Sequence, residues 1–449
     1  MRTSSTHFDD VTPLPIARPA EASWVVVAAG MACVISIQFG YTVHLSIGSA
    51  CFALACIYTI KRLTPLWLGV GLLGVVLVVI PHLFSPDDFA VDALYRSLRE
   101  AACFFVLVVL KTVTLNFSFE SQARIARAIW ILMIALLVMS ALQAIDLKYS
   151  RSELFFVPYA FFAPPSTPGG CWTIAACWLQ FEQAHGILTV IRPSATYSEP
   201  SYLGFIVLCL VFVSQNVLKG RHGGGKMAFI AAAMATVLLA QTTSGIISIV
   251  IMLLFATRPS PAKTAGIILA ALLFATGAGV VMSDRVSDIM RGTDMSFLAR
   301  FTYPFQAVSQ VLEKGYVLGV PSESLAKLVS NEVLAATDLS AGASDNGLIN
   351  MFLLYGICGG IALLAILFLR CSFPEIVFLV LSMQFNGSIF TYDKATLISL
   401  SLILFKARFD ANSGRRSLSL DGEPLDRLPY LRALPSRPAK PIKDVAATP

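Results

Sequence analysis

A stretch near the middle of the chain gathers residue types that are suited to chemistry. It reads IRPSATYSEPSYLG and places four polar side chains directly before a long apolar run, namely Arg192, Tyr197, Glu199 and Ser201. An arginine presents a rigid fork of donors that matches phosphate oxygens and keeps its charge, and a carboxylate can take a proton from a hydroxyl group. Alone, the charges could be interfacial anchors beside Pro200, a residue that suits the first turn of a helix. The whole constellation favours a ligand site.

A second group of polar residues lies further along the chain and adds to the same chemistry. It comprises Arg291, Arg300, Asp345 and Asn346. Asp345 and Asn346 stand where a helix is expected to begin, so capping of that helix explains them as well as a site role does. We take Glu199 and Asp345 as candidate catalytic residues. The candidate substrate-binding residues are Arg192, Tyr197, Ser201, Arg291, Arg300 and Asn346.

Sugar transfer from a lipid-linked diphosphate is one reaction that these residues fit. It needs positive charge at the leaving diphosphate, a base for the acceptor hydroxyl group, and a groove for the polyprenyl chain. Arg192, Arg291 and Arg300 are candidates for the positive charge. Glu199 and Asp345 are candidates for the base. Membrane-spanning helices would supply the groove.

The remaining sequence predicts a membrane-embedded frame for these residues. Of the 449 residues, 56% are hydrophobic and 13% are charged, which is typical of polytopic membrane proteins. A helix needs about 20 apolar residues to cross the hydrocarbon core. We predict an all-α polytopic integral membrane protein with about 12 transmembrane helices; the pair around residues 241–245 could instead be one kinked span. The segments lie at about residues 24–43, 44–60, 64–84, 100–117, 126–146, 201–218, 226–241, 243–257, 263–283, 346–369, 373–391 and 394–408.

Basic residues in short connections predict the orientation of these spans. If the amino terminus is cytoplasmic, alternation places each short basic connection inside, as the positive-inside rule requires. The two long loops, near residues 147–200 and 284–345, then fall in the periplasm, and both termini lie in the cytoplasm. The expected organisation is a cytoplasmic segment 1–23, a membrane domain 24–408, and a basic, disordered cytoplasmic tail 409–449. A helix is expected within the second loop, over FLARFTYPFQAVSQVLEKG.

Composition also argues against several other kinds of site. The nine cysteines lie mostly in apolar runs, and no Cys-x-x-Cys or Cys/His spacing indicates a metal site. Nothing in the sequence indicates a cofactor. The formal charge of +6 is explained by membrane topology and does not require a nucleic acid.

Four segments, in order, resemble those of the Wzy-type polysaccharide polymerases, bacterial proteins of the superfamily that includes O-antigen polymerases and ligases. The first is RPSATYSEPSYLG, and the second is QTTSGIISIVIMLL. The third is Arg300 followed by a helix and GYVLGV, and the fourth is SDNGLINMFLLYGICGGIALL. The resemblance covers roughly residues 180–370 and the topology of the whole chain.

The resemblance implies a metal-independent glycosyltransferase of the bacterial inner membrane, with a GT-C-like membrane architecture. Such an enzyme joins repeat units carried on undecaprenyl diphosphate, to make exopolysaccharide or O-antigen. Its partners would be the lipid-linked glycan, the lipid bilayer, a chain-length regulator and a flippase. Arg192 and Arg300 would bind diphosphate or sugar, and Glu199 would be the acid of the Glu-Pro-Ser motif.

Two departures from the family pattern bear on the alternatives. Asp345-Asn346 stands where ligases typically have His-Asn, which makes the O-antigen ligase alternative less favoured and leaves the base open. Ser244-Gly245 stands where many members have Ser-Arg, so one arginine is missing. A secondary transporter is the alternative from another class. It is less favoured because the charged residues fall mostly at loop positions, apart from Lys111 near the end of a span.

Overall fold

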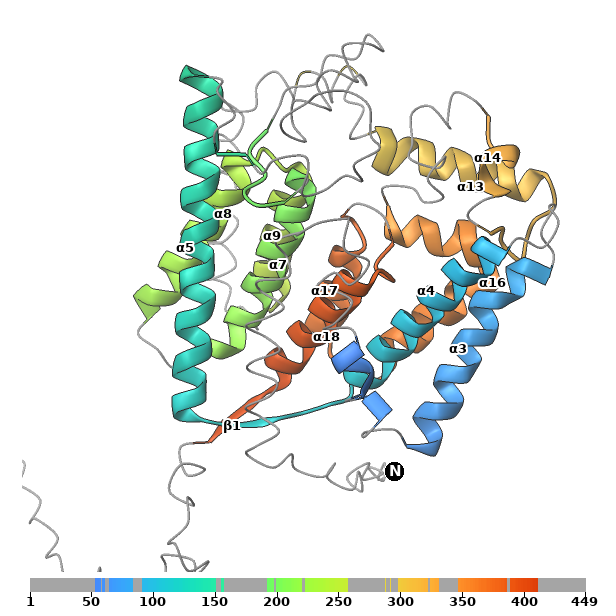
Figure 1. Cartoon of the computed structure of the whole chain (residues 1–449), viewed down its shortest axis with the longest axis horizontal. Coiled ribbons are helices and arrows are strands. Elements are labelled where there is room, and N and C mark those ends of the chain that lie inside the picture. The colour runs from blue at the N-terminus through green and yellow to red at the C-terminus, as the bar shows by residue number, and fades with distance from the viewer. Residues whose placement is uncertain are drawn as a thin grey trace, which may run out of the picture.

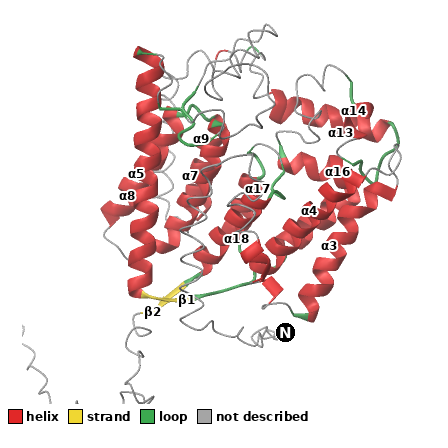
Figure 2. Cartoon of the chain, in the orientation of Figure 1, coloured by secondary structure: helices red, strands yellow, loops and turns green. Residues whose placement is uncertain are grey.

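Apolar segments form most of the helices, since a helix satisfies its backbone hydrogen bonds internally and so suits a membrane. In the computed structural model the described residues form a bundle of such helices (Figures 1 and 2). The structure describes residues 53–57, 59–60, 64–83, 91–150, 155–156, 192–197, 199–219, 223–256, 287, 291, 298–321, 324–330, 346–385 and 388–410. The bundle helices are α3 (Pro65–Leu83), α4 (Val91–Leu110), α5 (Phe119–Tyr149), α7 (Pro200–Val217), α8 (Gly223–Leu239), α9 (Thr243–Ala256), α16 (Gly347–Phe368), α17 (Phe373–Ser382) and α18 (Tyr392–Lys406).

The predicted class, an all-α membrane protein, is compatible with this architecture. By length and composition, three of the described helices could cross a membrane, namely α5, α7 and α16. Shorter apolar helices include α3, α8, α9 and α17. The expected helix in the second long loop is present as the π-helical turn η2 (Leu298–Thr302) and α13 (Tyr303–Glu313), followed by the short α14 (Leu325–Leu328). The total of about 12 spans stays a prediction.

Three features differ from the sequence-based expectations. The span predicted at 373–391 is only partly helical, because α17 ends at Ser382 and the chain turns before α18 begins. Helix α4 begins at Val91, well before the predicted start near residue 100, and within it the Tyr355 hydroxyl donates to the buried Glu100 carboxylate at 2.6 Å. A short parallel pair, β1 (Asn116–Ser118) with β2 (Arg408–Asp410), was not expected.

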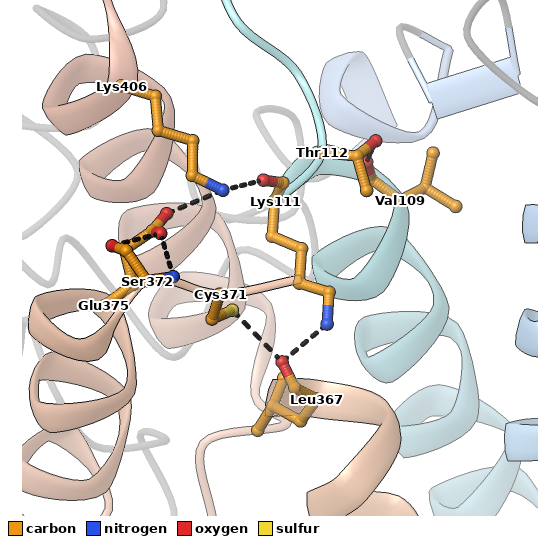
Figure 3. Close-up of polar contacts among 8 residues, drawn as sticks. All are labelled: Val109, Lys111, Thr112, Leu367, Cys371, Ser372, Glu375 and Lys406. Atoms are coloured by element: carbon orange, nitrogen blue, oxygen red, sulfur yellow. Dashed lines mark hydrogen bonds and ion pairs between the residues drawn. The ribbon is translucent and has the colours of Figure 1, made fainter. Parts of the chain in front are cut away.

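Buried lysines join several helices at one end of the bundle, which we call the basal end (Figure 3). The Lys111 ammonium, 1% exposed, donates to the carbonyl oxygens of Ile366 at 2.6 Å and Leu367 at 2.5 Å. It thereby caps the carboxyl end of α16, where a positive charge is favourable. The Lys406 ammonium donates to the Lys111 carbonyl oxygen at 2.5 Å and pairs with Glu375 at 2.6 Å. The connections after α4, α16 and α18 therefore lie together at this end.

Lys111→Met is expected to lower the free energy of unfolding by about 2–4 kcal/mol, because two buried carbonyl groups lose a charged donor. Thermal unfolding of the purified protein in detergent would measure the change. Lys148→Met, at an exposed position near the end of α5, is the matched control and should cost less than about 0.5 kcal/mol. Equal shifts for the two variants would contradict the capping role.

Helix α16 is kinked where a neighbouring segment docks against it. Gly356 has φ 70° and ψ 178°, which interrupts the helix. The segment that follows α13 fills the interruption, since the Val320 amide donates to the Leu353 carbonyl oxygen at 3.1 Å. The Ile357 amide likewise donates to the Val317 carbonyl oxygen at 3.3 Å. The kink thus joins the third and fourth segments of the family resemblance.

Candidate functional site

The first and second resemblance segments meet at the end of the bundle opposite the basal end, which we call the site end. Residues 192–197, here called the Arg192 loop, precede α7. One guanidinium nitrogen of Arg192, Nη1, donates to the carbonyl oxygen of Gln241 at 3.5 Å. Gln241 lies in the turn between α8 and α9, with φ 50°. The doubtful segment around residue 241 is therefore two helices joined by a turn that contacts Arg192.

A close approach of two glycines explains one departure from the family pattern. A Cβ atom on Gly204 of α7 would lie 3.4 Å from the Cα atom of Gly245 in α9, and 3.0 Å from the Thr242 hydroxyl oxygen. A Cβ atom on Gly245 would collide with that same hydroxyl group. A larger side chain at position 245 would therefore separate α7 from α9. Here, Gly245 serves helix packing at the place where the family often has an arginine.

Glu199 and Ser201 lie at the amino end of α7. Glu199 stands at the N-cap with extended backbone, φ −140° and ψ 145°, and Pro200 follows it in the first turn. The Ser201 hydroxyl group donates to Glu199 Oε2 at 2.9 Å. Tyr197 is only 2% exposed, and its ring centroid lies 5.4 Å from that of Tyr202. Tyr197 thus packs against Tyr202 in the structure, and its contact with substrate stays a prediction.

Asn346 brings Arg300 to the amino end of α16. Its Oδ1 atom accepts from the amides of Leu348 at 3.1 Å and Ile349 at 3.2 Å, which confirms the capping interpretation. Its amide nitrogen donates to the carbonyl oxygen of Arg300 at 3.0 Å and to Gln384 Oε1 at 3.1 Å. Asn346 thus caps α16 and also contacts Arg300, another candidate site residue.

Two predicted site residues are not joined to this arrangement by the structure. Asp345 lies outside the described residues. Arg291 has an exposed side chain, and its amide donates to the Ser287 carbonyl oxygen at 2.9 Å within its own segment. Their roles at the site stay predictions.

The segment after α17, residues 383–385, joins the two halves of the site. Gln384 accepts the hydrogen bond from Asn346, as described above. The next residue, Phe385, packs against α7, since a Cβ atom on Gly204 would lie 3.0 Å from its ring. The Arg192 side and the Arg300 side of the site therefore adjoin the same short segment.

Two charged residues that were not predicted as site residues also lie here, at the start of α18. The Tyr202 hydroxyl group of α7 donates to the Asp393 carboxylate. The Lys394 ammonium is buried and donates to the Phe385 carbonyl oxygen at 3.4 Å. A signal was present in the sequence, because this Asp-Lys pair stands at the junction of the last two predicted apolar segments. We call the whole group the polar cluster: Arg192, Glu199, Ser201, Tyr202, Gln241, Arg300, Asn346, Gln384, Asp393 and Lys394.

The two helices that flank Gln384 and Phe385 are short. Helices α17 and α18 have 10 and 15 residues, or roughly 15 and 22 Å at 1.5 Å per residue, less than the roughly 30 Å of a hydrocarbon core. Their upper ends lie below the upper end of α5 in Figure 1. Non-helical backbone at membrane depth occurs only where protein buries it or where it lines a water-filled space. Polar side chains beside the ends of these short helices are thus compatible with a membrane-embedded bundle.

Buried polar atoms without a protein partner occur on the segments that meet here. Among the described residues, no hydrogen-bond partner is found for Arg300 Nε or for the hydroxyl groups of Thr196, Thr242, Thr243 and Thr391. Such atoms are few in folded proteins, so each requires an explanation. Arginine and hydroxyl donors of this kind suit the oxygen atoms of a phosphate or a sugar.

The described residues contain no group of three or more His, Cys, Asp or Glu side chains placed to hold a metal ion. The donors of the polar cluster are instead arginine, lysine, amide and hydroxyl groups. Comparison of the chain with protein-family models, with curated proteins and with solved structures gave no match, so the inference of function rests on the geometry and chemistry of this cluster.

Proposed function

We propose that the chain is a bacterial inner-membrane polysaccharide polymerase. It joins oligosaccharide repeat units carried on undecaprenyl diphosphate, at the periplasmic face, for exopolysaccharide or O-antigen synthesis. The observations that carry the proposal are two contacts between separate chain segments at the site end, Arg192 with Gln241 and Asn346 with Arg300. These are the segments that resemble the polymerases.

In the proposed reaction, Arg192 and Arg300 neutralise the diphosphate of the donor glycan. The bond between the sugar anomeric carbon and the diphosphate oxygen breaks, and an acceptor hydroxyl oxygen bonds to that carbon. The electron pair stays on the leaving diphosphate, whose growing charge the arginines stabilise. A carboxylate takes the hydroxyl proton. The proposed enzyme is thus a metal-independent glycosyltransferase, and the proposed architecture is GT-C-like.

Three carboxylates are candidates for the base: Glu199, Asp345 and Asp393. Asp393 is added by its contact with Tyr202 in the polar cluster. The amino end of α16, capped by Asn346, adds partial positive charge beside Arg300. Such ends of interrupted membrane helices often face anionic substrates.

Asp393→Asn is expected to lower polymer formation by about 100-fold, since an amide cannot accept the hydroxyl proton. Tyr202→Phe removes one hydrogen bond but keeps the carboxylate, so we expect a loss of about 10-fold or less. Polymer length and amount, measured by gel electrophoresis of cell-surface glycan and normalised to membrane protein, would compare the two. A larger loss for Tyr202→Phe than for Asp393→Asn would remove Asp393 as the base.

The proposed orientation rests on the basal end. Lys111, Arg370 and Lys406 are on connections or helix termini that lie there, and the positive-inside rule assigns such an end to the cytoplasm. The polar cluster then faces the periplasm, and both termini are cytoplasmic. The proposed partners are the lipid bilayer, a flippase that delivers repeat units, and a chain-length regulator.

The lipid-linked glycans of a strain lacking this chain test the proposal. A single repeat unit on undecaprenyl diphosphate should accumulate and long polymer should disappear, with both restored by the wild-type gene. Full-length polymer retained on the carrier would indicate ligation instead.

A secondary transporter is the second candidate, and the Asp393-Lys394 pair favours it, since ionisable residues within a membrane often mark a transport path. The kink of α16 at Gly356 fits transporters as well, because their sites often lie at interrupted helices. Unchanged lipid-linked and surface glycans in the deletion strain would favour this function over polymerisation.

A further inference from the structure

We propose that Gln143 of α5 is a positioning residue that holds the Arg192 loop, and through it Arg192, in the geometry needed for catalysis. This inference rests on the proposed function. Gln143 comes from a helix that carries none of the predicted site residues, and its side chain is fully buried.

The Gln143 amide group uses its complete hydrogen-bonding capacity on backbone groups of loops. Its nitrogen donates to the carbonyl oxygens of Ala195 at 2.6 Å and Phe155 at 3.0 Å. Its oxygen accepts from the amides of Ser194 at 2.9 Å and Ala195 at 2.8 Å. A glutamine amide has two N–H donors and two acceptor lone pairs, so all four positions are occupied. Three of the four bonds go to the Arg192 loop.

We call the three hydrogen bonds from Gln143 to the Arg192 loop the clamp. The conformation of the loop explains why it needs them. Ala195 has φ 53°, in the left-handed region that residues with a Cβ atom seldom adopt. The Tyr197 amide closes a tight turn onto the Ser194 carbonyl oxygen at 3.1 Å. Strained backbone of this kind persists where surrounding contacts determine it. Gln143 binds both backbone polar groups of Ala195 and therefore fixes the strained residue directly.

Arg192 lies at the start of this loop, and α7 begins just after its other end. The clamp ties the loop to α5, and Pro200 continues into α7. If the clamp is lost, Arg192 is held only by its own contacts, including the long one to Gln241. A displacement of about 1 Å of a positioned group can cost about 100-fold in rate.

The chain provides a matched control on the same helix. Gln122 is also buried, and its amide nitrogen donates to the carbonyl oxygens of Val217 at 2.9 Å and Lys219 at 3.5 Å. It lies 21 residues before Gln143, or roughly 32 Å away along α5 at 1.5 Å per residue. Gln122→Leu thus removes two bonds between a buried glutamine of α5 and backbone carbonyl groups near the basal end.

The first measurement uses the full-length protein in lipid nanodiscs, supplied with lipid-linked repeat units extracted from the deletion strain. Gln143→Leu should lower the turnover rate per folded molecule by about 100-fold, and Gln122→Leu by less than about 3-fold. Because Gln143 acts through Arg192, adding Gln143→Leu to Arg192→Ala should lower the rate by less than about 3-fold more. Multiplicative losses in the double variant, or equal losses for the two glutamine variants, would overturn the positioning role.

The second measurement is hydrogen–deuterium exchange of the same proteins without substrate, and it does not depend on activity. Gln143→Leu should speed exchange of the Ser194 and Ala195 amides by at least about 10-fold, because they lose their acceptor. Amides of α7 and α5 should keep their protection. Unchanged exchange in the loop would overturn the clamp even if the enzyme is a polymerase. Faster exchange in the loop, combined with no polymerase activity in the wild type, would support the clamp and reject the proposed function.

Discussion

Arg300→Ala is expected to lower polymer formation by about 1,000-fold while the protein still folds and enters the membrane. Removing one donor that stabilises developing charge typically costs about 100- to 1,000-fold, and here a full positive charge is lost beside a leaving diphosphate. The fold should tolerate the change, because Asn346 contacts Arg300 through the main-chain carbonyl oxygen. Arg300→Lys keeps the charge but loses the planar fork, so we expect an intermediate loss of about 10- to 100-fold.

Arg124→Ala is the matched control for Arg300→Ala. Arg124 lies near the basal end of α5, in an exposed ion pair with Glu120 at 3.8 Å, and exposed pairs of this kind contribute little. Glycan electrophoresis and immunoblotting of membranes would measure polymer and protein in the same cells. Wild-type chain length in Arg300→Ala would contradict the assignment of this arginine, as would equal losses in the two variants.

Gly356→Ala is expected to destabilise the protein by at least about 3 kcal/mol, a large share of the total stability of a typical folded domain. The left-handed backbone at φ 70° accounts for about 1–2 kcal/mol. The added Cβ atom would also lie 2.5 Å from the carbonyl carbon of Leu318 and would collide with Val317, so the docked segment would have to move. The hydrogen bonds that fill the kink of α16 would then be lost.

Alanine substitutions at two other glycines distinguish the cost of backbone strain from the cost of a steric collision. Gly315 has φ 86° but no atom within 4 Å of an added Cβ atom, so Gly315→Ala should cost only about 1–2 kcal/mol. Gly69, in α3, has neither strain nor a neighbour within 4 Å, and Gly69→Ala should stabilise its helix by up to about 1 kcal/mol. Thermal unfolding in detergent would rank the three variants. If Gly356→Ala were as stable as Gly315→Ala, the docking at the kink would be wrong.

Local signals in the sequence were sufficient to predict the positions of several helices. Pro200 marks the start of α7, and the observed helix Pro200–Val217 agrees with the prediction to within a residue at each end. Capping was one of two explanations for Asn346, because its position before an apolar run is characteristic of an N-cap, and the structure shows that cap. The helix after Arg300 was also found from its pattern. These elements are determined mainly by neighbours in the sequence.

The elements that differed from the sequence-based prediction depend on contacts between segments that are distant in the chain. Within α4, Glu100 is buried, and its partner Tyr355 comes from another helix. The pairing of Asn116 with Arg408 joins segments from opposite parts of the chain. The short α17 could have been anticipated, since Asn386-Gly387 is a common turn former within the predicted span.

The same distinction applies to the candidate site. Residue type and position in the sequence selected Arg192, Arg300 and Asn346 as candidates, and the last two are in direct contact. They did not select Asp393 or Gln143, because their roles arise from hydrogen bonds to Tyr202 and Ala195. Spacing along the chain does not reveal such contacts.

Reconstitution tests the central claim most directly. The purified chain, in proteoliposomes, would receive a single repeat unit on undecaprenyl diphosphate, isolated from the deletion strain, with a metal chelator present. We predict a ladder of longer glycans that remain attached to the lipid carrier, formed by the wild type and nearly absent with Arg300→Ala. A repeat unit that stays unchanged, with folded wild-type protein in the same vesicles, would contradict the proposed polymerase.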